Sequence, residues 1–171
     1  MIRGLDEELA ALKYAHVERE RRFLVDSARR PDLAGVAHIL IEDRYIDGAR
    51  MRLRRMTASD SGRVVLKLSK KYDVANVSAR PMVTTYLTQA EYGLLAALPA
   101  HPLVKRRHDL GIFSIDLFEG KLAGLELAES EQPDASSLAA LVRPDWALTE
   151  VTDDPAYQGG NLALADHPPI R

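Results

Sequence analysis

Charged residues recur on one side of short alternating segments along this chain. In residues 16–25, HVERERRFLV, alternate side chains of a strand share a face, so Glu18, Glu20 and Arg22 lie together and Phe23 lies opposite. The apolar end of the segment favours a β-strand. On a solvated edge strand such a face has no special meaning. Lining a closed cavity, it would form half of a site for a cation and for phosphate.

Later segments repeat this pattern with either sign of charge. Strands are expected at 38–46, 49–56, 63–71, 82–87, 103–108, 112–120 and 125–131. Their candidate site residues are Arg50, Arg52, Arg54, Lys105, Arg107, Asp116, Glu129 and Glu131. A basic stripe also occurs on surfaces that bind nucleic acid, but the stripe at 49–56 lacks the interleaved aromatic residues of a base-stacking sheet.

The simplest fold that accommodates these strands is a closed antiparallel β-barrel with its charged residues inside. An ordinary sandwich buries its apolar faces and leaves its charges in water, yet here acidic and basic faces alternate between strands. Closure removes the sheet edges, and water, ions and a polyphosphate would fill the interior. We therefore predict the α+β class, with a charged barrel and flanking helices on its apolar outside.

Helices are predicted at four places, 5–14, 31–37, 89–98 and 135–142. The third begins with a capping box, in which Thr88 is the N-cap and Glu91 lies three residues on. Its apolar stripe is expected to pack on the core. Residues 166–171 are expected to form a loose tail.

Length and composition limit the possible classes of protein. The chain has 171 residues, a formal net charge of −2 and no cysteine. The length suits one domain over residues 1–171. Without cysteine, any metal ion must be held by oxygen or imidazole ligands. No segment has the apolar run of a signal peptide or a membrane span, so we expect a cytoplasmic protein without a membrane partner.

Several charged motifs follow one another in an order that matches a known family. Glu-x-Glu-x-Arg at 18–22 runs into Phe-Leu-Val. The later motifs are Tyr45 before Arg52-x-Arg54, then Lys105-x-Arg107, Asp116-x-Phe-x-Gly, Glu129-x-Glu131 and the region around Glu150. Together they resemble the CYTH family, the triphosphate tunnel metalloenzymes. The resemblance implies an eight-stranded tunnel and metal-dependent chemistry on triphosphates.

The resemblance also implies roles for individual residues. Carboxylates would hold Mg²⁺ or Mn²⁺, namely Glu18, Glu20, Asp116, Glu129 and Glu131. Cations would bind phosphate oxygens, namely Arg50, Arg52, Arg54, Lys67, Lys105 and Arg107. Arg22 and Tyr45 match a Lys–Tyr pair that activates the attacking water in some members. Glu150 would lie in the tunnel.

Two departures from the family pattern bear on activity. Arg22 stands where the family usually has lysine, and arginine is a poor proton acceptor because its pKa is above roughly 12. Met82 and Thr84 stand where the best-known members carry a further Glu-x-Glu. These changes could slow catalysis, alter the substrate or leave a binding protein.

The predicted function is metal-dependent hydrolysis of inorganic triphosphate or of a small organic triphosphate, such as a nucleotide or thiamine triphosphate. One alternative is a non-catalytic CYTH module that binds polyphosphate or nucleotide. Another is a class IV-type adenylate cyclase, although no adenine motif is evident. A basic patch for nucleic acid is the remaining alternative. We expect no nucleic-acid partner, and a homodimer is left open.

Overall fold

The computed structural model describes residues 14–72 and 78–169. The helix predicted at 5–14 therefore lies, apart from Tyr14, outside the described residues. Within the described residues, nine strands form one sheet. They are β1 (His16–Val25), β2 (Ile39–Ile46), β3 (Met51–Ala58), β4 (Val64–Lys71), β5 (Ala79–Tyr86), β6 (Ala100–Leu110), β7 (Phe113–Phe118), β8 (Glu126–Glu131) and β9 (Ala147–Glu150).

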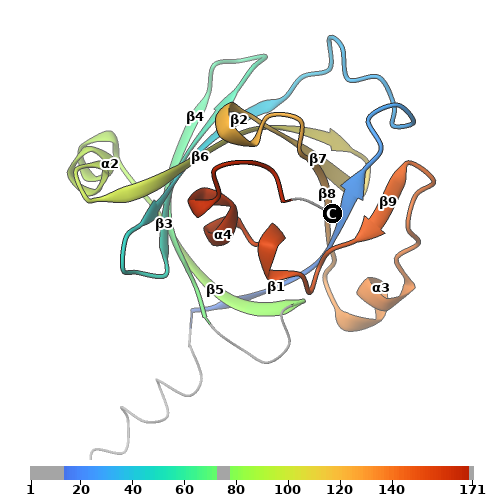
Figure 1. Cartoon of the computed structure of the whole chain (residues 1–171). Helices are drawn as coiled ribbons and strands as arrows, with labels where there is room; N and C mark the ends of the chain where they lie inside the picture. The colour runs from blue at the N-terminus through green and yellow to red at the C-terminus, as the bar shows by residue number, and fades with distance from the viewer. Residues whose placement is uncertain (1–13, 73–77, 170–171) are drawn as a thin grey trace, which may run out of the picture.

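Eight of these strands close into an antiparallel barrel, as predicted. The strand order is β5-β4-β3-β2-β6-β7-β8-β1, and an antiparallel pairing of β1 with β5 joins the two ends. The ring of strands is visible in Figure 1. In this pairing Glu18 lies opposite Arg80. The short strand β9 pairs with the last residues of β1, beyond the pairing with β5.

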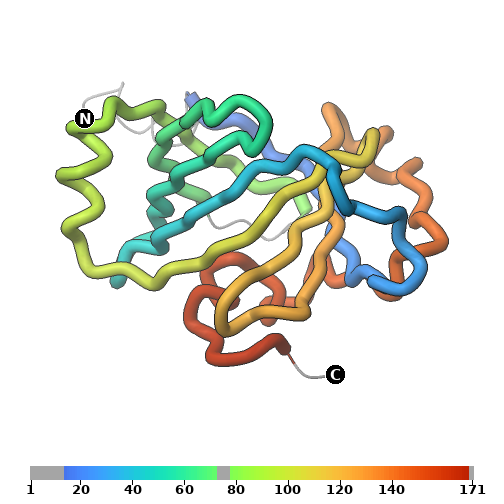
Figure 2. The backbone as a smooth tube through the Cα atoms, turned by 90° about the horizontal axis from the view of Figure 1, so that it is seen from above, coloured from blue at the N-terminus to red at the C-terminus, as the bar shows by residue number. Residues whose placement is uncertain are grey.

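The inner face of the barrel changes from charged to apolar along the strands. Leu24, Leu103, Phe118 and Leu127 have the same parity as the charged inward residues of their strands, and they join one apolar cluster. The chain end, residues 153–164, covers this cluster with η2 (Pro155–Tyr157) and α4 (Gly159–Leu164). Helix α4 contributes the buried Leu162. Figure 1 shows this segment across one opening of the barrel, and Figure 2 shows it at one end of the strands.

One side of the outer face is covered by a loop and a short helix. Phe23, Ile115 and Ala128 pack outward against Leu33 from the loop after β1 and against Leu141, which ends α3 (Ala135–Ala140). The loop and α3 thus cover an apolar outer patch. The helix expected at 31–37 is wrong, because this described stretch is irregular apart from a turn at residues 34–35.

Helix α2 (Gln89–Ala96) forms with the predicted capping box, since Thr88 Oγ1 accepts from the amide of Glu91 and the Glu91 carboxylate accepts from the amide of Thr88. The expectation that its apolar stripe packs on the core is wrong. The helix has no buried residue, and Leu94 is 78% exposed. A short turn, η1 (Gly120–Leu122), follows β7. No helix in the described part of the chain is long and apolar enough to cross a membrane.

A buried histidine on the outer face, His108, gives a testable pH dependence. His108 is 5% exposed, its ring centroid lies 5.2 Å from that of His38, and its Nδ1 has no hydrogen-bond partner. Burial, His38, Arg30 and Arg106 together lower the pKa of His108 against the opposing effect of Asp109. A folded-state pKa below the unfolded value of about 6.5 means that stability is present above that pH and is lost as the pH falls below it.

We therefore expect the melting temperature to fall between pH 7.5 and 5.5, and to fall less in a His108→Phe variant, which keeps a ring but cannot be protonated. Thermal unfolding followed by circular dichroism at several pH values measures the difference. Equal pH dependence in the two proteins would contradict the assignment of this effect to His108.

Candidate active site

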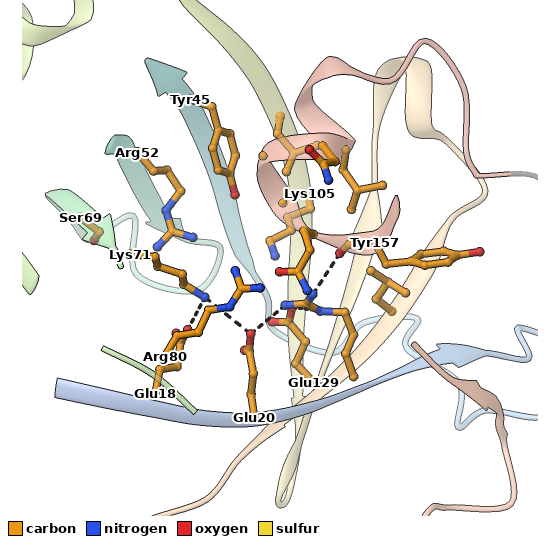
Figure 3. Close-up of a pocket in the computed structure, with 18 of the residues that line it drawn as sticks. Glu18, Glu20, Tyr45, Arg52, Ser69, Lys71, Arg80, Lys105, Glu129 and Tyr157 are labelled. Atoms are coloured by element: carbon orange, nitrogen blue, oxygen red, sulfur yellow. Dashed lines mark hydrogen bonds and ion pairs between the residues drawn. The ribbon is translucent and has the colours of Figure 1, made fainter. Parts of the chain in front are cut away.

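The charged part of the barrel interior is a cavity of about 540 Å³. This volume falls within the range of roughly 300–1,000 Å³ typical of small-molecule sites. The inward faces of most barrel strands and the chain end line it (Figure 3). Its charged lining residues are Glu18, Glu20, Arg22, Arg50, Arg52, Arg54, Lys71, Arg80, Lys105, Arg107, Glu129, Glu131 and Asp153.

Three carboxylates on one wall are each held by cations. Glu18 forms an ion pair with Lys71, whose Nζ also lies 3.5 Å from Oε1 of Glu20. Glu20 accepts from Nη2 of Arg22 at 2.8 Å. Glu129, opposite Arg22 in the pairing of β1 with β8, accepts from Nε of Arg22 at 2.9 Å. Lys71 and Arg22 thus separate carboxylates that would otherwise repel one another.

The pKa values of these carboxylates follow from the balance of burial and pairing. Burial raises the pKa of Glu20, and repulsion from Glu129 adds to this against the attraction of Arg22. For Glu18, burial is outweighed by Lys71, so the pKa is lowered. For Glu129, the nearby cations Lys105, Arg22 and Arg107 outweigh burial and hold the pKa well below its usual range. Glu20 is therefore the carboxylate least stabilised in its charged form.

The basic wall is positioned by two buried aspartates that lie beside its cations on neighbouring strands. Asp116, fully buried on β7, accepts from Nε and Nη2 of Arg107 at 2.7 and 2.6 Å and also from Lys105. Asp43, buried on β2, accepts from Nε and Nη2 of Arg54 at 2.6 and 2.7 Å. Bidentate pairs of this kind fix the plane and direction of a guanidinium. The aspartates therefore orient cations toward the cavity.

Arg52 and Arg80 differ from Arg54 and Arg107 in the hydrogen bonding of their Nε atoms. The Nε atom of each is buried without a hydrogen-bond partner. Both side chains reach into the cavity in Figure 3, beside Lys71. Arg52 is hydrogen-bonded to Tyr45, and its Nε lies 3.8 Å from Oδ1 of Asp43. A buried guanidinium N–H without a hydrogen-bond partner is costly unless an anion or water accepts from it. These two residues are therefore the best candidates for direct contact with an anion.

The chain end contacts two cavity residues, Tyr45 and Arg22. A Cβ atom built on Gly159 would lie 2.0 Å from Oη of Tyr45, so only glycine fits beside this hydroxyl. Arg22 donates through Nη1 to the carbonyl of Tyr157 at 3.0 Å. Its backbone amide donates to Thr152 Oγ1 at 2.9 Å. Burial raises the pKa of Tyr45 despite the opposing effect of Arg52, so the phenol stays protonated.

Most of the predicted site residues line this one cavity. The exceptions are Lys67, Asp116 and Glu150. Lys67 lies outside the lining, with its ammonium 5.9 Å from the ring centroid of Tyr86. Asp116 has the inward parity of Ser114 and Phe118 but is fully buried beside Arg107 and does not line the cavity. The tunnel position expected for Glu150 is wrong, because this exposed residue on β9 pairs with Arg21.

Sequence reasoning missed Asp43, Ser69, Lys71, Arg80 and the chain end from Asp153 to Leu162. Alternation along β4 could have identified Lys71, since Lys67, Ser69 and Lys71 share one face of this strand. Alternation along β5 likewise places Arg80 on the same face as Met82 and Thr84. The hydroxyl of Thr84 is 2.9 Å from the hydroxyl of Ser69. The chain end gave no alternating charge signal, because it is not a strand.

The carboxylates suit a divalent cation by their chemistry, because hard cations take oxygen ligands. Glu18, Glu20 and Glu129 face the cavity close enough to repel one another. In the arrangement described here their oxygens accept from Lys71, Arg22 and Arg107. Among the described residues, no three acidic or histidine side chains are already grouped to hold one ion. Asp116 is also a poor ligand candidate, since Lys105 and Arg107 occupy both of its oxygens.

Comparisons with solved structures agree with this geometry. The inorganic triphosphatase NE1496 superposes with a TM-score of 0.57 and 24% identity, over 88% of this chain and 96% of that one. A second structure of NE1496 gives 0.56 and 24%, over 87% of this chain and 99% of that one. The chain therefore has the fold of these structures, a closed antiparallel eight-stranded barrel. The resemblance read from the sequence motifs is confirmed at the level of the fold, and the charged cavity lies inside this barrel.

One curated relative is also similar in sequence. An inorganic triphosphatase from Acetivibrio thermocellus is 44% identical over 50 residues, which are 29% of this chain. The match spans only 31% of the relative's own length. No protein-family model matches the chain. The sequence similarity therefore covers less than a third of either chain.

Proposed function

We propose that the tunnel binds a triphosphate and hydrolyses it with the help of a divalent cation. The observation that carries this proposal is the mixed lining of one cavity, in which eight cationic side chains and five carboxylates converge. A triphosphate carries several negative charges, so it matches a lining in which cations outnumber carboxylates. Similarity to inorganic triphosphatases supports the same class of substrate.

In this proposal the basic wall positions the substrate. Positioning and charge neutralisation do most of the work in phosphoryl transfer. The cations that would bind phosphate oxygens are Arg50, Arg52, Arg54, Lys105 and Arg107. Because Tyr45 stays protonated, it would act as a hydrogen-bond donor. Arg22 would hold the carboxylate wall in place and would not accept a proton.

The opposite wall would hold Mg²⁺ or Mn²⁺ through Glu18, Glu20 and Glu129. Such an ion, when bound, supplies charge neutralisation and a polarised water for attack on phosphorus. Since the chain end and its apolar cluster cover one opening, a substrate enters from the other side. An organic group attached to the triphosphate would remain near that entrance. We therefore propose inorganic triphosphate or a small organic triphosphate as the substrate.

Phosphate release tests this proposal, with inorganic triphosphate, ATP and thiamine triphosphate as substrates and Mg²⁺ or Mn²⁺ present. We expect release from at least one substrate, and its loss in EDTA. A Glu18→Ala/Glu20→Ala variant should lose roughly 100-fold or more, because removing one preorganised electrostatic group typically costs about 10²–10³ in rate. Glu42→Ala, on the outer face of β2, is the matched control and should retain activity.

A non-catalytic phosphate-binding module is the second candidate. It is favoured by Arg22, whose three guanidinium nitrogens are used by Glu129, Glu20 and the carbonyl of Tyr157. No phosphate release from any substrate, together with a triphosphate-induced rise in melting temperature, would establish this module and exclude hydrolysis. A cytoplasmic location, a homodimer and the lack of nucleic-acid or membrane partners stay predictions.

A further inference from the structure

Lys71 lies where a cation between the carboxylates would lie. Its Nζ pairs with Oε2 of Glu18 and is 3.5 Å from Oε1 of Glu20. Figure 3 shows the ammonium pointing from β4 toward both carboxylates on β1. Burial lowers the pKa of Lys71, but Glu20 and Glu18 outweigh burial, so the net shift is upward and the side chain stays charged. An ammonium on a flexible stem therefore already neutralises this part of the wall.

The lining as a whole, with Lys71, Glu18 and Glu20 included, carries an excess of positive charge. Its cations outnumber its carboxylates by eight to five. Arg80, on β5 opposite Glu18, has a buried Nε without a hydrogen-bond partner, and no carboxylate among the described residues is within ion-pair distance of it. Asp43 and Asp116, which pair with Arg54 and Arg107, offset part of this excess. The cavity remains attractive to a polyanion without any added cation.

We propose that Lys71 is a built-in substitute for a divalent cation, so that triphosphate binds in the tunnel without metal and a metal ion competes with Lys71 for Glu18 and Glu20. This inference rests on the proposed function, because it takes triphosphate as the ligand. An ion bound at the two carboxylates would release the Lys71 ammonium, which has the reach and the donors to contact phosphate. Lys71 thereby makes occupation of the metal position dependent on the presence of phosphate.

Two calorimetric titrations test this proposal, triphosphate in EDTA and Mn²⁺ without phosphate. Wild type should bind triphosphate in EDTA and should bind Mn²⁺ weakly. In a Lys71→Met variant we expect at least tenfold tighter Mn²⁺ binding, because Glu18 and Glu20 lose their resident cation. The same variant should bind triphosphate at least tenfold more weakly in EDTA.

The matched control is Lys70→Met, one residue away on the outer face of β4. Lys70 is exposed and lies 5.1 Å from the ring centroid of Tyr72, so both affinities should match wild type. A second variant, Lys71→Arg, keeps the positive charge and should therefore keep triphosphate binding in EDTA. This variant tests the proposal even if Lys71→Met does not fold.

Three outcomes separate this inference from the function on which it rests. Triphosphate binding only when Mn²⁺ is present would overturn the role of Lys71 and leave the proposed function standing. Unchanged Mn²⁺ affinity in folded Lys71→Met would also overturn it. Absence of triphosphate binding under every condition would overturn both proposals together.

Discussion

Replacing Asp116 by alanine is expected to lower the free energy of unfolding by about 3–5 kcal/mol, since removing one partner of a buried ion pair leaves the other charge uncompensated. Asp116 is fully buried and accepts from both Lys105 and Arg107. Burial already lowers the pKa of Lys105, and Asp116 opposes that effect. Loss of the carboxylate would therefore favour neutral Lys105 and weaken the basic wall.

Urea unfolding followed by circular dichroism measures this effect. Asp109→Ala is the control, because Asp109 is exposed on the neighbouring strand β6 and accepts from Ser114 Oγ at 2.9 Å. Such an exposed substitution should change stability by no more than about 0.5 kcal/mol. Asp116→Asn keeps a hydrogen-bond acceptor without the charge. Its free energy of unfolding should lie between those of Asp116→Ala and Asp109→Ala. Equal stability of Asp116→Ala and Asp109→Ala would show that the buried pairs do not stabilise the barrel.

Replacing Gly159 by alanine is expected to displace the chain end from the tunnel opening. The added Cβ would lie 2.0 Å from Oη and 3.0 Å from Cζ of Tyr45, so either the ring or α4 must move. Overpacking of this kind costs about 1–3 kcal/mol. The shift would also disturb Arg22, whose guanidinium donates to the carbonyl of Tyr157. We therefore expect reduced stability together with weaker triphosphate binding.

Gly160 provides a matched control in the same helix. A Cβ there would meet Tyr45 only at ordinary contact distances of 3.8 and 3.9 Å. Gly160→Ala should be neutral or slightly stabilising, because alanine favours helix over glycine by about 1 kcal/mol. Combining Gly159→Ala with Tyr45→Phe removes the nearest atom and should restore part of the lost stability. A Gly159→Ala protein as stable as Gly160→Ala would mean that the chain end does not press on Tyr45.

The sequence by itself determined which side chains of each strand face inward. The alternation in a strand has a period of two, so Glu18, Glu20 and Arg22 had to share a face whatever their neighbours. The opposite signs of charge on different strands then favoured a closed barrel, and this was confirmed. Local chemistry also sufficed for the capping box of α2, because it needs only Thr88 and Glu91.

The pairing of charges across the interior was decided only by the tertiary structure. Strand stagger and barrel closure set which inward residues come within reach, and neither can be read from one strand. Lys71 reaches Glu18 while Lys67, with the same parity, lies against Tyr86. The cover formed by α4 depends on Gly159 fitting against Tyr45, residues more than one hundred positions apart. Alternation therefore predicted the two faces of each strand, while long-range packing fixed the closed end and the partner of each charge.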